Sequence, residues 1–146
     1  MSKLPSVSII IPTYNRKDVL IEALLSLNKV NYPKKLFEVI VINDGSSDGT
    51  ENAIKNIRGK INYNFKYFNG GRRGISHAKN IAIKKSKGEI IISTDDDCLF
   101  EKTWLKKLIK PFVNPKVGAV GGPDRAIKNE NVLAKSIDFT FSSFIG

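Results

Sequence analysis

The 146-residue chain has the size of one domain, and its hydrophobic fraction of 41% and charged fraction of 26% are ordinary for a globular protein. Its apolar runs are only a few residues long, far short of the ~20 residues that a membrane-spanning helix needs. The single cysteine, Cys98, excludes an internal disulfide and a zinc site built from several cysteines. We expect a protein without a signal peptide, in a reducing cytoplasm.

The formal net charge of +10 is high for this length. Such an excess of lysine and arginine favours phosphate-bearing partners, and it would suit peripheral association with the anionic inner face of a membrane. A lysine-rich solvated surface explains the charge equally well. Because no stretch interleaves basic and aromatic residues as nucleic-acid platforms do, we expect no nucleic-acid partner.

Short apolar runs alternate with helical patterns along the chain. Residues 7–11, VSIII, predict a first strand, which we expect Pro12 to end. A helical apolar stripe follows over residues 16–28, with Asn15 as its expected cap. Residues 37–43, FEVIVIN, predict a second strand, and the SSDG turn after it predicts the start of another helix.

The next segments continue the alternation. Residues 61–67 alternate apolar and polar side chains, which predicts a strand at an edge of the sheet. A helix opens near Ser76, and residues 89–94 predict a fourth strand, central like the first two because it is apolar on both faces. The remaining expected elements are a helix over 103–112, a fifth strand over 117–122 and a weakly helical tail over 132–144.

Strand and helix alternation of this kind predicts an α/β fold with a mainly parallel sheet and flanking helices. Ligands of such sheets bind where the strands reach their carboxyl edge. The loops expected there are all polar, and they read PTYNR, NDGSSDG, NGGRRG and DDD in chain order. Together they offer a ring to stack, an acceptor for a base N–H, cations for phosphate and carboxylates for a metal.

The acid triplet after the fourth strand is the most unusual of these loops. Three adjacent carboxylates beside a core repel one another and lose hydration. A divalent cation offsets that repulsion, and Mg²⁺ and Mn²⁺ prefer hard oxygen ligands supplied by one or two carboxylates and substrate phosphates. The triplet therefore predicts a Mn²⁺ or Mg²⁺ site, with a solvated turn as the alternative.

Three blocks of the sequence carry a resemblance to a known family. VSIIIPTYNR, EVIVINDGSSDGT and GISHAKNIAIKKSKGEIIISTDDD resemble, in order and spacing, the family 2 glycosyltransferases of GT-A fold over residues 6–105. The resemblance implies an enzyme that transfers a sugar, with inversion, from a nucleotide-sugar donor. A UDP-sugar is the expected donor, a glycan or a lipid-linked molecule the expected acceptor, and polysaccharide synthesis the expected setting.

The resemblance also implies which residues bind the nucleotide. Pro12, Thr13 and Tyr14 match the positions that contact the base and the ribose. Asp44 matches the acid that accepts a hydrogen bond from the uracil N–H. A loop-packing tyrosine and a turn-capping aspartate are the alternatives for Tyr14 and Asp44.

The acid triplet covers the DxD motif of the family. Asp97 matches the metal-binding acid, and Asp95 or Asp96 would serve the ribose or the water shell of the metal. Arg72 and Arg73 lie where some members place a basic residue toward the nucleotide, and we take Arg73 as the candidate. Solvated loop arginines are the alternative.

An inverting transfer needs a general base, which deprotonates the acceptor hydroxyl. In the family this base is an acid well downstream of the DxD motif, and Asp124, Glu130 and Asp138 do not stand in a similar context. We therefore expect the base beyond Gly146. Residues 1–146 are then a truncated GT-A fold, a single nucleotide-sugar-binding domain at the N-terminal end of a longer enzyme.

Two other functions fit parts of the sequence. A non-catalytic, basic α/β module that binds nucleotides or polyanions would show the same loops without the base, and sugar release from a donor separates the two. A nucleotidyltransferase would need a glycine-rich basic loop after the first strand, where this chain has PTYNR.

Overall fold

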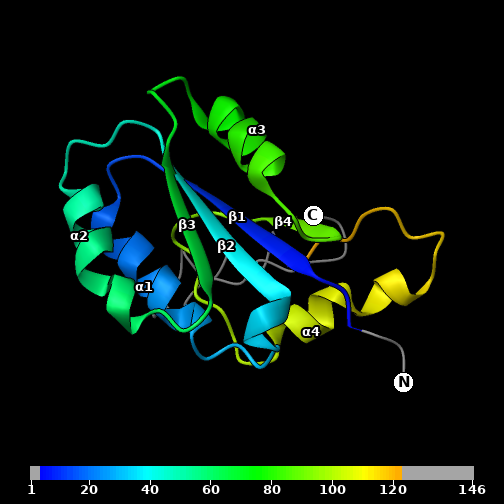
Figure 1. Cartoon of the computed structure of the whole chain (residues 1–146). Coiled ribbons are helices and arrows are strands. Elements are labelled where there is room, and N and C mark those ends of the chain that lie inside the picture. Colours follow the sequence, from blue (N-terminus) through cyan, green and yellow to red (C-terminus); the bar gives the residue numbers. More distant parts are fainter. Residues whose placement is uncertain (1–3, 123–146) are drawn as a thin grey trace, which may run out of the picture. The chain divides into compact units, whose positions relative to one another are not determined.

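The computed structural model describes residues 4–122. The chain divides into two compact units after Lys106. The first unit contains a sheet and three helices, and the second contains the end of one helix and a short 3₁₀ turn (Figure 1). The tail helix expected over residues 132–144 lies outside the described residues, and one domain over residues 1–146 stays a prediction.

The sheet of the first unit has four strands in the order β3-β2-β1-β4, and every neighbouring pair is parallel. The predicted mainly parallel sheet and the edge position of the third strand are therefore confirmed. The strands are β1 (Val7–Thr13), β2 (Phe37–Asn43), β3 (Asn64–Asn69) and β4 (Ile90–Ser93).

Helices cover both faces of this sheet, as the alternating pattern predicts. Figure 1 shows α3 on one face and α1 and α2 on the other. The helices are α1 (Lys17–Leu27), α2 (Thr50–Ile57), α3 (Ile75–Lys85) and α4 (Trp104–Ile109), with 3₁₀ turns η1 (Lys34–Leu36), η2 (Arg58–Lys60) and η3 (Lys110–Val113). None of the helices within residues 4–122 is long and apolar enough to cross a bilayer.

The core explains why the central strands are apolar on both faces. Ile10, Ile40 and Ile42 pack under α3 against Ala78 and Ala82, where small side chains let the helix approach the sheet. Successive side chains of a strand point to opposite faces. The alternate residues therefore face α1 and α2, and they are fully buried: Ile9, Ile11, Val39 and Val41.

Two strand predictions are wrong. The fourth strand was expected in the centre, but β4 is an edge strand of the described sheet because residues 117–122 form no strand there. Three of these six residues, in VGAVGG, are glycines, which contribute no side chain to pack and so disfavour a strand.

The expected end of the first strand is also corrected, because β1 continues through Pro12 to Thr13. Ile10 accepts a bond from the Thr94 N–H on the β4 side. Pro12, two residues on, faces the same side beyond the last β4 pair, so its missing N–H removes no ladder bond.

The N-terminal cap of α1 differs from the prediction as well. Asn15 has a left-handed φ of 52°, and its side-chain oxygen accepts a bond from the Ser47 N–H. The first helical N–H, that of Lys17, instead donates to Asp48 at 2.8 Å. Asp48 also accepts bonds from the N–H and the hydroxyl of Thr50 at the start of α2. One carboxylate therefore caps the N-termini of both helices. These bonds hold the pKa of Asp48 below its ordinary value although burial alone would raise it.

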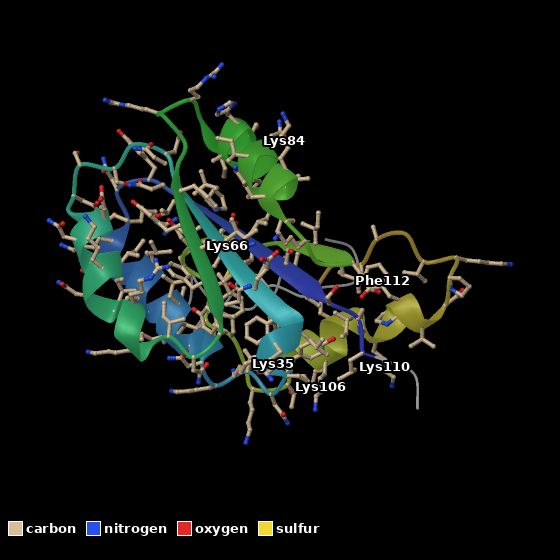
Figure 2. The ribbon with its side chains drawn as sticks, in the orientation of Figure 1. Lys35, Lys66, Lys84, Lys106, Lys110 and Phe112 are labelled. Carbon is tan, nitrogen blue, oxygen red and sulfur yellow. The ribbon has the colours of Figure 1, made fainter. Side chains whose placement is uncertain are left out.

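A buried ion pair lies on the face of the sheet that α3 covers, near the amino end of β2. Glu38 of β2 is 6% exposed and pairs with Lys66 of β3, which lies over the middle strands in Figure 2. Glu38 also accepts bonds from the Ser8 hydroxyl at 2.7 Å and the Lys87 N–H at 2.8 Å. The sequence pattern, which read this strand as wholly apolar in its interior, did not predict the pair.

Candidate functional site

A cavity of 340 Å³ opens at the carboxyl edge of the sheet. The ends of β1, β2 and β4 and the first residue of α3 form it. Its walls contain every site residue predicted from the sequence except Arg73, and they add Arg16 and Ile75, which the sequence did not predict. The lining residues are Pro12, Thr13, Tyr14, Arg16, Asp44, Ile75, Asp95, Asp96 and Asp97.

Asp96 is the buried member of the acid triplet, at 4% exposure. Its Oδ2 accepts a hydrogen bond of 2.7 Å from the hydroxyl of Thr13, which is itself buried. Burial raises the pKa of Asp96, and the Thr13 bond and the Arg16 charge lower it in part. The end of β1 therefore fixes the first residues after β4 through one buried contact.

Arg16 contacts two acids of the triplet, Asp96 and Asp97, which with Asp95 form the acidic wall of the cavity. Its Nη1 lies 3.2 Å from Asp96 Oδ1, and its Nη2 donates a 2.7 Å hydrogen bond to Asp97 Oδ2. The bond to Asp97 and the charge of Asp96 raise the pKa of Arg16. The sequence showed Arg16 only as part of the PTYNR loop after β1. The contact follows because β1 lies directly beside β4 in a parallel sheet, so the loops that follow the two strands are neighbours.

The triplet thus spreads its charge over three different partners. Asp95 is largely exposed, and its Oδ1 lies 3.8 Å from Lys79 Nζ on α3. Asp96 turns inward to Thr13, and Asp97 turns toward Arg16. Three adjacent acids are therefore tolerated after the strand because each contacts a cation or a donor, with Arg16 shared by Asp96 and Asp97.

Asp44 organises the loop between β3 and α3. Its two carboxylate oxygens accept hydrogen bonds from the Arg73 and Gly74 N–H groups at 2.8 and 2.7 Å. Gly74 precedes the first residue of α3, so the carboxylate also sits at the start of that helix. Asp44 is buried yet lines the cavity, so the contacts that hold the loop do not remove it from the cavity wall.

Arg72 and Arg73 of the same loop make different contacts. The backbone of Arg73 contacts Asp44, whereas the guanidinium of its neighbour Arg72 lies 5.8 Å from the ring centre of Tyr14. Gly45 makes this arrangement possible. It has a φ of 82°, and a Cβ there would lie 2.9 Å from the Arg72 Cβ.

The model of the glycosyl transferase family 2 matches residues 8–145. The chain belongs to this family. It is 32% identical over 146 residues to the poly-beta-1,6-N-acetyl-D-glucosamine synthase of Staphylococcus epidermidis, covering 99% of this chain and 34% of that protein. It is 31% identical over 121 residues to the glycosyltransferase AglE of Haloferax volcanii, covering 83% and 40%. The family 2 chain thus spans about a third of the length of such relatives.

Solved glycosyltransferases share the fold of this family 2 chain, which confirms the GT-A prediction. The mannosyltransferase PcManGT of Pyrobaculum calidifontis, in complex with GDP-Man and Mn²⁺, matches with a TM-score of 0.76 at 31% identity, over 84% of this chain and 37% of that one. TarS 1-349 of S. aureus in complex with UDP-GlcNAc matches with a TM-score of 0.63 at 31% identity, over 85% and 38%.

The acidic wall fits a divalent cation that is shared with a ligand. Within residues 4–122, no three histidine, cysteine or acidic side chains converge as a closed metal cage. Mg²⁺ and ions like it are typically held by one or two carboxylates plus substrate phosphates, which is a smaller demand on the protein. Asp97 meets that demand, because its side chain is 46% exposed and lines the cavity.

Proposed function

We propose that the chain is the donor-binding portion of a metal-dependent glycosyltransferase. The enzyme would transfer a sugar from a nucleotide-sugar, preferably a UDP-sugar, with inversion, to a glycan or lipid-linked acceptor. The observation that carries this proposal is the single cavity that joins Tyr14, Asp44 and the acid triplet at the carboxyl edge of the sheet. The nucleotide-sugars named in the PcManGT and TarS structures support it.

The nucleoside would lie against Pro12, Thr13 and Tyr14. The Tyr14 ring is partly exposed in the cavity and offers a stacking face for a base. Each carboxylate oxygen of Asp44 accepts one hydrogen bond from the loop backbone. Because a carboxylate has about four acceptor sites, Asp44 can accept a further bond from a uracil N–H. We also propose that Arg73, which lies beside Arg72 in the loop held by Asp44, contacts the nucleotide.

The acids would hold the metal and the ribose. We assign Asp97 to Mn²⁺ or Mg²⁺, and Asp95 or Asp96 to the ribose or the water shell of the ion. When bound, such an ion neutralises the charge that develops on a departing nucleotide diphosphate. Asp96, fixed by Thr13, would set the position of its neighbour Asp97.

The general base is not assigned to this chain. Among the described residues, the only acids that line the cavity are Asp44 and the triplet, all of which have other roles in the proposal. We therefore assign the base to the part of the relatives' length that lies beyond Gly146. The net charge of +10 supports work at the cytoplasmic face of an anionic membrane.

Calorimetric binding of UDP, GDP and dTDP, each with Mn²⁺ and with EDTA, tests the proposal. We expect UDP to bind best and only with metal, and Asp97→Asn to lower that affinity at least tenfold because it removes the charge that holds the ion. Asp18→Asn is the matched control, since Asp18 is an exposed acid of α1 outside the cavity. Equal UDP affinities with Mn²⁺ and EDTA would contradict the metal-dependent proposal. Metal-dependent binding without sugar release by a chain extended through the missing base would favour the non-catalytic module.

A further inference from the structure

Arg16 already supplies positive charge where the proposed metal would sit. Its guanidinium contacts Asp96 Oδ1 at 3.2 Å and Asp97 Oδ2 at 2.7 Å, so one cation bridges two adjacent acids of the cavity wall. The two Nη groups of a planar guanidinium contact the two carboxylates in a fixed fork, a geometry that the ammonium group of a lysine does not offer. In the structure, Asp97 is therefore paired with a cation of the chain itself.

The backbone of Arg16 is fixed on both sides. The Asn15 N–H donates to the Ser46 hydroxyl at 2.8 Å, and the Lys17 N–H donates to Asp48 at the same distance. The Arg16 carbonyl accepts the Leu20 N–H in the first turn of α1. Any exchange of partners by Arg16 must therefore be a motion of its side chain alone.

That side chain is free enough to move. Both members of the Arg16–Asp97 pair are about half exposed, at 48% and 46%. Ion pairs between exposed groups contribute little to stability, because water competes for each charge and holding two long side chains costs entropy. A divalent cation, with twice the charge and a direct bond to the carboxylate, competes well against such a pair.

We propose that Arg16 is the resident counter-ion of the cavity. It neutralises Asp96 and Asp97 in the nucleotide-free chain, yields Asp97 to the divalent metal, and then pairs with the diphosphate of the donor. The inference rests on the proposed metal role of Asp97. The second step follows from charge, because a guanidinium beside a divalent cation is repelled by it and a diphosphate brings the anion that pairs with both.

The proposal predicts effects of opposite sign for a single substitution. Arg16→Gln should tighten the binding of Mn²⁺ alone by about fivefold, because the competing cation is gone. The same variant should weaken the binding of UDP at saturating Mn²⁺ by about tenfold, because a charged hydrogen bond to phosphate is lost. Electron paramagnetic resonance of free Mn²⁺ measures the first constant on the full chain, and calorimetry measures the second.

Two variants serve as controls. Lys17→Gln removes the same charge from the adjacent residue, which does not line the cavity, and we expect it to leave both constants within twofold of the wild type. Arg16→Lys keeps the charge but loses the planar fork that spans both acids, and we expect a gain in Mn²⁺ affinity smaller than that of the glutamine variant. Thermal unfolding of each variant reports whether the fold is retained.

The outcomes separate this inference from the proposed function. Mn²⁺ affinity that is unchanged or weaker in Arg16→Gln, and abolished in Asp97→Asn, would overturn the counter-ion role and leave the metal site standing. Mn²⁺ affinity that Asp97→Asn does not change would overturn the metal role of Asp97 and the inference with it. A tighter metal constant with an unchanged UDP constant would overturn the diphosphate step.

Discussion

At the scale of single residues, contacts between side chains of different loops build the acidic wall of the cavity. The cavity contains Thr13, Asp44 and Asp97 because Thr13 ends β1, Asp44 follows β2 and Asp97 lies in the loop after β4, and strand ends can be read from the pattern. The contact of Arg16 with Asp97 depends instead on which strands are neighbours. Asp48 likewise displaced Asn15 as the cap of α1, because an acid from another loop reaches the same N–H.

The buried bond between Thr13 and Asp96 gives a first test at this scale. Thr13→Val should lower the free energy of unfolding at pH 7 by about 2 kcal/mol, since it removes the hydroxyl donor from a buried carboxylate oxygen. Thr13→Ser keeps the hydroxyl and should lose much less. Urea denaturation of both variants measures the difference.

The same substitution has a predicted pH dependence. The Thr13 bond lowers the pKa of Asp96, so the valine variant should hold this pKa higher than the wild type does. A raised carboxyl pKa in the folded state costs stability as the pH rises through it. The difference between valine and wild type should therefore grow from acid to neutral pH, and a constant difference would argue against the bond.

At the scale of elements, the apolar pattern predicted the strands and helices, and the exceptions have local causes. β1 contains Pro12 because β4 ends before it, and residues 117–122 form no strand because half of them are glycine. The first case depends on the register of β1 and β4, which is not visible in the pattern of a single segment, whereas the second depends on the composition of the segment itself. Gly88 is a further example. A Cβ there would lie 2.4 Å from the Ser8 nitrogen, so the connection from α3 to β4 can pass this close to β1 only with a glycine at this position.

The ion pair of Glu38 and Lys66 links β2 to β3 and, through the Lys87 N–H, to the α3–β4 connection. Glu38→Gln should lower the free energy of unfolding at pH 7 by about 3 kcal/mol, because it leaves the partly buried Lys66 unpaired. Glu51→Gln, which breaks the exposed pair with Lys55 on α2, is the matched control and should cause no resolvable change. Urea denaturation midpoints compare the two.

The loss at Glu38 should depend on pH in a defined direction. Burial raises the pKa of Glu38, but the bonds from Lys66, Ser8 and Lys87 outweigh it and hold the pKa below the ordinary 4.5. A lowered carboxyl pKa contributes stability above the unfolded-state value, and that stability is lost as the pH falls through the folded-state pKa. The difference in free energy of unfolding between wild type and Glu38→Gln should thus shrink below pH 4.5. An equal difference at pH 7 and below pH 4.5 would refute the pairing.

At the scale of the whole molecule, the fold and the family were predictable because three motif blocks keep their order and spacing. The blocks end at the acid triplet, and they contain three of the four strands of the described sheet. The sequence alone left the donor nucleotide, the acceptor and the base open, because these depend on cavity shape and on length that the chain does not share with its relatives. What the molecule offers is a cavity of 340 Å³ whose lining includes an aromatic ring and four acids.

The most direct test of the central claim is to locate the bound metal–nucleotide complex on the fold. Nuclear magnetic resonance of the ¹⁵N-labelled chain with UDP and Mn²⁺, compared with UDP and Mg²⁺, reports which amides lie near the paramagnetic ion. The account predicts that signals vanish for residues 13–16, 44–45, 73–75 and 95–98, which surround the cavity, and persist at the amino ends of the strands. Broadening centred on the amino edge of the sheet, or none at all, would contradict it.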